Sequence, residues 1–460
     1  MIGLPPFLSF SENERTLQLK NTYDYPTYRK KTFSSLNIAA SVLLFLAAIL
    51  AAVVANSSLS PVYQDFLLQE LHLRIGNFNL FSHGGHPLKM IEFINDCLMT
   101  VFFLAVGLEI KRELLVGELS SVRKAALPFI AACGGMVVPV VIYALSVASG
   151  TPETQGMAIP MATDIAFSLG VLSLLGKRVP LSLKIFLTAF AVVDDIGGIL
   201  VIALFYSADV AYGYLIAAAV LYVFLYYMGK FGVTQKIFFL FFGVIIWYLF
   251  LQSGIHSTIS GVILAFVIPA RPRLDAGKYI ERIRDIIGEF PVSKSDNIVL
   301  TNAQIATLKQ VERASDYVIS PLQSLEDNLH GAVSFVILPL FAFANAGVVF
   351  SGSGNIVGDV SIAVAAGLLL GKFLGIYLFT WLAVKSGVAL MPAGMNWKNI
   401  AGVSLLGGIG FTVSLFIANL SFADEYPELL NQAKFGVLVG TVLAGVLGYV
   451  VLNWVLPKRD

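Results

Sequence analysis

The sequence predicts an all-α polytopic membrane protein. Of its 460 residues, 57% are hydrophobic and only 13% are charged, and the mean hydropathy is +0.81. Soluble domains carry about 25% charged residues, so this chain has too few polar side chains to cover a soluble protein of its length. The composition therefore excludes a soluble enzyme, a disordered protein and a nucleic-acid binder. Helices remain because they satisfy their own backbone hydrogen bonds in lipid.

Twelve apolar stretches predict the membrane spans, because a helix needs about 20 apolar residues to cross a bilayer. They cover residues 36–55, 91–110, 125–148, 158–175, 182–206, 211–228, 236–252, 254–269, 332–350, 360–385, 400–421 and 435–456. An even number of spans places both chain ends on one side of the membrane. All Lys and Arg fall on that side except Arg74, Lys89, Lys372 and Lys434. The positive-inside rule therefore predicts that both termini are cytoplasmic.

The remaining segments define the predicted domain organisation. We expect a cytoplasmic N-terminal tail (1–35), a transmembrane domain (36–456) with an external segment (57–88) and a cytoplasmic loop (271–328), and a cytoplasmic C-terminus (457–460). In the external segment, the alternation of Leu71, Leu73 and Ile75 before a Gly-Asn pair favours a β-hairpin. An irregular loop is the alternative. The charged cytoplasmic loop is long enough for a small helix or a disordered insertion.

Four ionisable residues lie inside predicted spans. They are Asp164, Asp194, Asp195 and Lys372. Each charge near the middle of a bilayer costs roughly 2.5–3.5 kcal/mol, so together they oppose insertion by about 10 kcal/mol. A structural Asp–Lys pair is one explanation, but it does not account for two adjacent aspartates with one lysine. We therefore interpret Asp194 and Asp195 as functional residues.

Asp194 and Asp195 predict a site that protons and a cation share. Adjacent residues point about 100° apart on a helix, so both side chains can line one cavity. Two neighbouring carboxylates away from water exchange protons nearer to neutral pH than exposed carboxylates do. Their oxygens also suit a hard cation such as Na⁺, and the Thr163 hydroxyl adds a further ligand. Because protons and the cation compete for one site, alternating access makes an antiporter that needs no cofactor, whereas a channel needs a continuous path.

Helix breakers lie near these charges. Pro160 precedes Thr163 and Asp164 in the fourth span. The eleventh span contains Gly402, Gly407, Gly408 and Gly410. Interrupted helices expose their end dipoles, so Asp164 is placed to balance positive N-terminal ends and Lys372 negative C-terminal ends. Close helix packing is the alternative for these glycines, and it is our interpretation of the glycines spaced four apart around Lys372.

Five motifs closely resemble those of the bacterial NhaA-type sodium/proton antiporters. Residues 163–167 read Thr-Asp-Ile-Ala-Phe, residues 194–197 Asp-Asp-Ile-Gly, residues 371–372 Gly-Lys, residues 102–114 Phe-Phe-Leu-Ala-Val-Gly-Leu-Glu-Ile-Lys-Arg-Glu-Leu, and residues 338–347 Leu-Pro-Leu-Phe-Ala-Phe-Ala-Asn-Ala-Gly. They occur in the expected order, and the resemblance runs from about residue 36 to residue 456.

The resemblance implies a fold of twelve helices in inverted repeats, with broken helices four and eleven crossing near mid-membrane. It implies export of Na⁺ or Li⁺ in exchange for more than one proton, across a bacterial inner membrane. In that family the residue matching Asp195 binds cation and proton, and the one matching Asp194 shares the site and pairs with the lysine matching Lys372. Thr163 and Asp164 match residues at the helix-four break. Membrane lipid surrounds such a protein, and a homodimer through residues 57–88 is also implied.

The resemblance further implies residues that respond to pH. Glu109, Lys111, Arg112 and Glu113 match the family's cytoplasmic entrance, and His256, Glu326 and His330 match positions linked to pH response. Asp327 stands where the family often has a histidine, which makes this likeness less complete. The alternative is an interfacial charge cluster that ends a helix, with an unremarkable interfacial histidine.

Three other functions compete with Na⁺/H⁺ exchange. A K⁺/H⁺ antiporter would use the same site residues. An intramembrane aspartyl protease needs one carboxylate from each of two helices, so Asp164 would have to partner one of the adjacent aspartates. A passive channel would conduct without coupling to protons.

Overall fold

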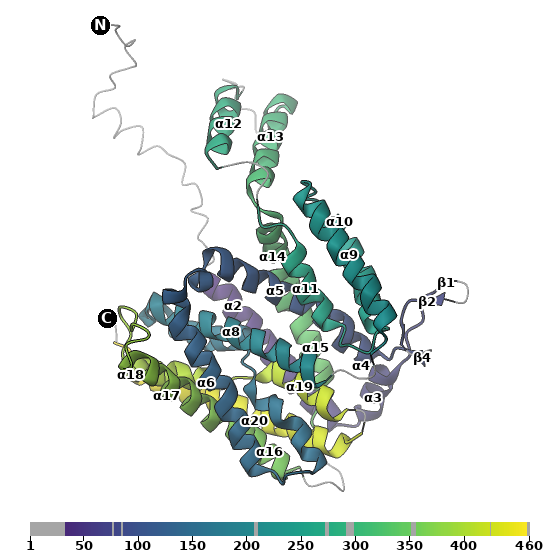
Figure 1. The fold of residues 1–460 in the computed structure, drawn as a ribbon, viewed down its shortest axis with the longest axis vertical. Coiled ribbons are helices and arrows are strands. Elements are labelled where there is room, and N and C mark those ends of the chain that lie inside the picture. The colour runs from purple at the N-terminus through teal and green to yellow at the C-terminus, as the bar shows by residue number, and fades with distance from the viewer. Residues whose placement is uncertain are drawn as a thin grey trace.

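Helices make up nearly all of the described chain (Figure 1). The computed structural model describes residues 33–75, 78–83, 86–206, 210–271, 276–290, 299–350, 356–423 and 425–457. The Gly-Asn pair expected at the hairpin turn lies outside these residues, as do nearly all of the N-terminal tail and most of the C-terminus.

Among the described residues, eight helical runs are long and apolar enough to cross a membrane. They are α2 (Phe33–Ala55), α4 (Met90–Phe93) with η1 (Ile94–Leu98) and α5 (Met99–Val116), α6 (Val122–Ser146), α8 (Leu181–Phe205), α9 (Tyr212–Lys230), α14 (Pro321–Ala332) with η5 (Val333–Ile337) and α15 (Leu338–Asn345), α16 (Asp359–Ala366) with η6 (Gly367–Gly371) and α17 (Lys372–Lys385), and α20 (Pro427–Val455). The turns η1, η5 and η6 are π-helical. Together with the composition, these runs confirm a polytopic helical membrane protein.

Two further spans are broken where the sequence predicts breaks. The first consists of η3 (Pro152–Met161) and α7 (Ile165–Leu174), which are bent by 45°. The second consists of α18 (Trp397–Leu406) and α19 (Phe411–Phe422), which are bent by 44°. The two breaks touch each other, because the Asp164 N–H donates to the Ile409 carbonyl at 2.6 Å.

The two remaining predicted spans, residues 236–252 and 254–269, correspond to shorter helices. Helix α10 (Lys236–Leu251) has 16 residues and α11 (Thr258–Val267) has 10. Both are apolar, but each is shorter than the roughly 20 residues that a perpendicular span needs. The total of twelve spans and the inverted repeat therefore stay predictions.

The two long connections contain regular structure. The connection over residues 57–88 holds α3 (Ser60–Leu68) and two antiparallel pairs, β1 (Arg74–Ile75) with β2 (Phe78–Asn79) and β3 (Ser82–His83) with β4 (His86–Pro87). The predicted hairpin is confirmed, with Ile75 opposite Phe78. The connection predicted over residues 271–328 holds α12 (Ala276–Gly288) and α13 (Asn302–Val318), which project together from the rest of the protein (Figure 1). Helix α14 begins at Pro321, before the expected end of this loop at residue 328, and continues into a candidate span.

Glycines bring two of these helices into close contact. A Cβ on Gly375 of α17 would lie 2.1 Å from the Gly134 carbonyl oxygen on α6, and a Cβ on Gly371 would lie 2.6 Å from Pro139 Cα. No larger residue fits without moving a backbone. Small residues allow this approach in membranes, where packing rather than water exclusion holds helices together. The predicted packing role is confirmed, and it fixes the position of Lys372 between these glycines.

The 3₁₀ turns η2 (Glu118–Ser120) and η4 (Gly176–Arg178) link neighbouring helices.

Candidate cation and proton site

Asp164 joins the N-terminal ends of the two broken helices. One carboxylate oxygen accepts a hydrogen bond from the Phe167 N–H at 3.0 Å, which caps α7. The other oxygen accepts from the Thr412 hydroxyl at 2.6 Å and from the Thr412 N–H at 3.2 Å, at the start of α19. A negative charge here opposes the partial positive charges of both helix ends. These contacts place Asp164 where its predicted balancing role requires, and the role itself stays a prediction.

The C-terminal end of α18 is satisfied by neutral donors. The Thr163 hydroxyl donates to the Gly407 carbonyl at 2.8 Å, and the Ser168 hydroxyl donates to the Leu406 carbonyl at 3.0 Å. Lys372 was expected to balance such carbonyl ends, and this expectation is wrong. Its ammonium lies 2.6 Å from an Asp194 carboxylate oxygen, which is the pair that the family resemblance implies, and both side chains are 0% exposed. Attraction between full charges in a dry site exceeds attraction to a partial charge at a helix end.

The two adjacent aspartates of α8 face different surroundings. Asp195 lines a cavity, whereas Asp194 is not among the described residues that line it. The helical period explains the difference, since neighbouring residues point about 100° apart. The expectation that both carboxylates line one cavity is thus right for Asp195 only. The second oxygen of Asp194 has no hydrogen-bond partner among the described residues.

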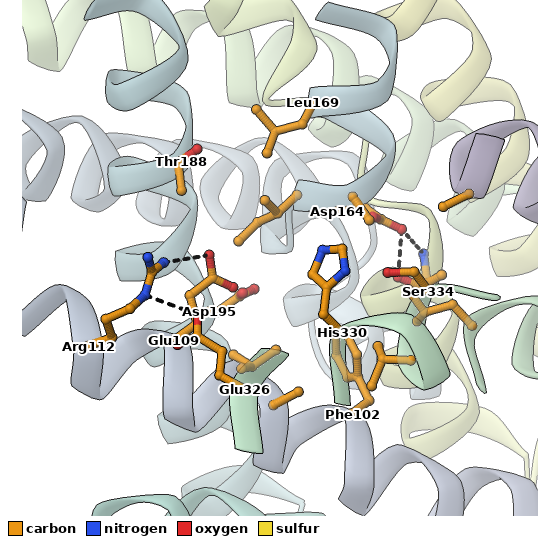
Figure 2. A pocket seen from close by; sticks show the side chains of 18 of the residues that line it. Phe102, Glu109, Arg112, Asp164, Leu169, Thr188, Asp195, Glu326, His330 and Ser334 are labelled. Atoms are coloured by element: carbon orange, nitrogen blue, oxygen red, sulfur yellow. Dashed lines mark hydrogen bonds and ion pairs between the residues drawn. The ribbon is translucent and has the colours of Figure 1, made fainter. Parts of the chain in front are cut away.

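The cavity has a volume of about 650 Å³, and its lining residues differ in exposure along its length. At the α14 end, the lining residues Gln323, Asp327 and His330 are exposed. At the deep end, Thr163 and Thr412 are each 1% exposed. Figure 2 shows the lining side chains from Glu109 and Arg112, past Asp195, to Asp164. A small ion entering from the α14 side therefore meets oxygen atoms at the breaks.

A charged cluster joins α5 to α14 beside the open end. The Arg112 guanidinium lies 3.0 Å from Glu326, 3.1 Å from Glu113 and 3.9 Å from Glu109 (Figure 2 draws all but Glu113). We call these four residues the Arg112 cluster. His330 lines the same cavity.

Two of the predicted pH-response residues lie elsewhere among the described residues. The Lys111 ammonium donates to the carbonyls of Ala265 at 3.3 Å, Phe266 at 2.7 Å and Ile268, where α11 ends. A positive charge at a helix C-terminus stabilises that end, so Lys111 supports α11. His256 comes just before α11 and does not line the described cavity.

Comparison with known proteins decides the family. The family profile described as Na⁺/H⁺ antiporter 1 matches residues 31–452. A Bacteroides fragilis protein named Na(+)/H(+) antiporter NhaA is 76% identical over 429 residues, which cover 93% of this chain and 98% of that protein. The chain belongs to the NhaA antiporter family. A protein of the same name from Bacteroides thetaiotaomicron is 75% identical over 429 residues (93% of this chain, 98% of that one), and NhaA 1 of Saccharophagus degradans is 42% identical over 426 residues (92% and 90%).

Membership of the NhaA family, together with the apolar helices, makes this an integral membrane protein. The structure adds Thr412 and Thr188 to the side chains that surround the NhaA-type cavity. Thr412 follows the last glycine of the second break by two residues, and a hydroxyl beside a helix break was the signal for it. Thr188 lies seven residues before Asp195, on the same face of α8, and the helical period was the only signal for it.

Proposed function

We propose that this protein exchanges Na⁺ for protons across a membrane, with Asp195 alternately carrying the cation and a proton. The observation that supports Asp195 is its place: it is the aspartate of α8 that lines the cavity, whereas Asp194 is paired with Lys372. The relatives named as Na⁺/H⁺ antiporters support the choice of ions.

The ligands around the deep end suit a small alkali ion. Asp195 and Asp164 offer carboxylate oxygens, and Thr163 and Thr412 offer hydroxyl oxygens. Hard cations prefer such oxygen ligands over nitrogen or sulfur. Li⁺ has the same preference, so we include it as a transported ion. The hydroxyls keep lone pairs for a cation while they donate to their present acceptors.

The buried charges support an electrogenic cycle. Asp164, Asp194 and Asp195 against Lys372 leave two formal negative charges when all four are ionised. One Na⁺ offsets one of these charges, and two protons offset both. Exchange of one Na⁺ for two protons therefore moves net charge, and the membrane potential contributes about 2.3 kcal/mol per charge per 100 mV.

The Arg112 cluster is the proposed point of regulation by pH. Protonation of Glu113 or Glu326 removes an ion pair to Arg112, which joins α5 to α14 at the open end of the cavity. Separation of the two helices there changes access to Asp195. We place both termini and this open end in the cytoplasm of a bacterial inner membrane, since Lys and Arg concentrate on that side. A homodimer through residues 57–88 belongs to the same proposal.

Everted vesicles test the exchange. Addition of Na⁺ to vesicles with an imposed ΔpH is expected to dissipate that gradient with the parent protein and not with Asp195→Asn, while K⁺ has little effect on either. The variant's presence in the membrane is the control. Full Na⁺-dependent dissipation by Asp195→Asn would refute the role of Asp195, and dissipation by K⁺ alone would replace Na⁺ as the substrate.

A further inference from the structure

Three asparagines from distant parts of the chain form a continuous hydrogen-bonded bridge. The Asn345 amide donates to the Asn95 side-chain oxygen at 2.8 Å, and the Asn419 amide donates to the Asn345 side-chain oxygen at 2.9 Å. They lie on η1, on the last residue of α15 and on α19. Asn345 is 0% exposed and Asn419 is 9% exposed. We call this set the asparagine bridge.

Two of the three amides also bind their own helices. Asn345 donates to the Phe341 carbonyl at 3.0 Å, and Asn419 donates to the Leu415 carbonyl at 2.7 Å. Both amide hydrogens of Asn345 and of Asn419 are therefore used. Paired amide donors are stable in a dry place, whereas an unpaired amide there is costly.

The asparagine bridge has a regular relation to the cavity. Each asparagine lies seven positions along its helix from a cavity-lining residue: Asn95 from Phe102, Asn345 from Leu338, and Asn419 from Thr412. Seven residues are two helical turns, or about 10 Å. The same three helical segments that surround the deep end of the cavity are thus tied together two turns beyond it.

The layer between the cavity and the asparagine bridge is dry. Met99 and Phe341 are 0% exposed and Phe416 is 1% exposed, and the rings of the two phenylalanines lie 6.4 Å apart. None of the three asparagines lines the cavity among the described residues. In the helical run Met90–Val116, Asn95 lies near the first end and Arg112 near the last. The asparagine bridge therefore lies beyond a dry layer, on the side away from the exposed α14 residues, and we call this the sealed side.

We propose that the asparagine bridge is the latch of this sealed side, and that transport requires Asn95, Asn345 and Asn419 to separate and re-form their bonds in each cycle. This rests on the proposed exchange, which needs access from the second side. Amides suit a latch because they pair with each other when the three segments meet and with water when they part. A seal made of apolar side chains would instead expose apolar surface to water each time it opened, which is unfavourable.

The backbone on both sides of the latch supports separation. Asn95 lies in the π-turn η1, a wide turn that can change register within a helix and is frequent at functional sites. Asn345 ends α15, and residues 346–350 continue without helical structure. Both segments can therefore shift without breaking a regular helix.

Sided thiol labelling tests the latch. The background is Cys97→Ser and Cys133→Ser, which replaces the two free cysteines, with Ser334→Cys as reporter in the cavity. A membrane-impermeant maleimide is added to right-side-out or inside-out vesicles without Na⁺. The parent is expected to label much faster from the open side. Asn345→Asp loses a donor and adds a charge to a dry place, so labelling from the sealed side should rise about tenfold.

Asn431→Asp is the matched control. Asn431 binds the Val349 backbone from α20 at 3.0 and 2.9 Å and is not part of the asparagine bridge. We expect the same labelling from both sides as in the parent. If Asn345→Asp does not insert, Asn95→Asp and Asn419→Asp replace it and should also speed labelling from the sealed side.

The outcomes separate the latch from the exchange itself. Unchanged sealed-side labelling in inserted asparagine variants overturns the latch, whether or not the protein transports Na⁺. An equal rise with Asn431→Asp also overturns it, because the effect would then be general loosening. Absence of Na⁺-dependent ΔpH changes in the parent overturns the proposed function and leaves the labelling result standing.

Discussion

Lys372→Ala breaks the ion pair that fixes Asp194 in the membrane. The two groups lie 2.6 Å apart with fully buried side chains, so the substitution leaves a carboxylate with no compensating charge. Removal of one partner of a buried pair costs about 3–5 kcal/mol. The cost of protonating the carboxylate gives a similar value. For an aspartic acid with the ordinary pKa of about 3.9, protonation at pH 7.5 costs about 5 kcal/mol. The loss is a large part of a typical stability of about 5–15 kcal/mol.

The stability of the Lys372→Ala variant should depend on pH, because the cost of protonating the unpaired Asp194 carboxylate falls as the pH falls. Neutralising the carboxyl costs only about 2 kcal/mol at pH 5.5, so the variant should lose less stability in acid than near neutral pH. Thermal unfolding in detergent at both pH values measures this against the parent. Lys372→Met with Asp194→Asn removes both charges and should recover most of the loss.

Lys398→Ala supplies the control, because Lys398 is an exposed lysine on α18 with no ion pair among the described residues. It should leave the unfolding temperature nearly unchanged. The reasoning fails if the Lys372 variant is as stable as the parent at pH 7.5, or if the double variant is no more stable than the single one.

Three further outcomes are expected. Thr412→Val removes the hydroxyl that donates at 2.6 Å to the carboxylate at the helix breaks, and should weaken apparent Na⁺ affinity about tenfold in transport assays, while Thr412→Ser should not. Gly375→Ala places a Cβ 2.1 Å from the Gly134 oxygen and should cost about 1–3 kcal/mol in detergent unfolding; Gly198→Ala, with no heavy atom within 4 Å, is the control. Arg112→Gln removes the ion pairs between α5 and α14 and should flatten the dependence of exchange on pH, and an unchanged pH profile would contradict a regulatory role.

Local sequence patterns were sufficient for the class of the protein and for much of the fold. Composition alone indicated a membrane protein, because few charged residues cannot cover a soluble surface. Pro160 with Thr163, and the glycines from 407 to 410, marked both breaks, since backbone preferences act within a few residues. The alternation before Phe78 identified the external hairpin for the same reason.

The predicted loop over residues 271–328 overlaps the start of helix α14. Polar side chains over residues 321–330 predict that the loop extends to residue 328, yet α14 starts at Pro321. A helix that lines a cavity with polar side chains has the composition of a loop. Hydropathy cannot separate the two, since it reports on solvent contact rather than on backbone structure.

By itself, the sequence determined that this is a helical membrane protein with charges and helix breaks where lipid should exclude them. Only the tertiary structure decided that Asp195 rather than Asp194 lines the cavity, and that Lys111 supports α11. It alone brought Asn95, Asn345 and Asn419 together. The physical reason is that composition and periodicity are properties of neighbouring residues, whereas these contacts depend on which helices pack side by side and on how each is rotated about its axis.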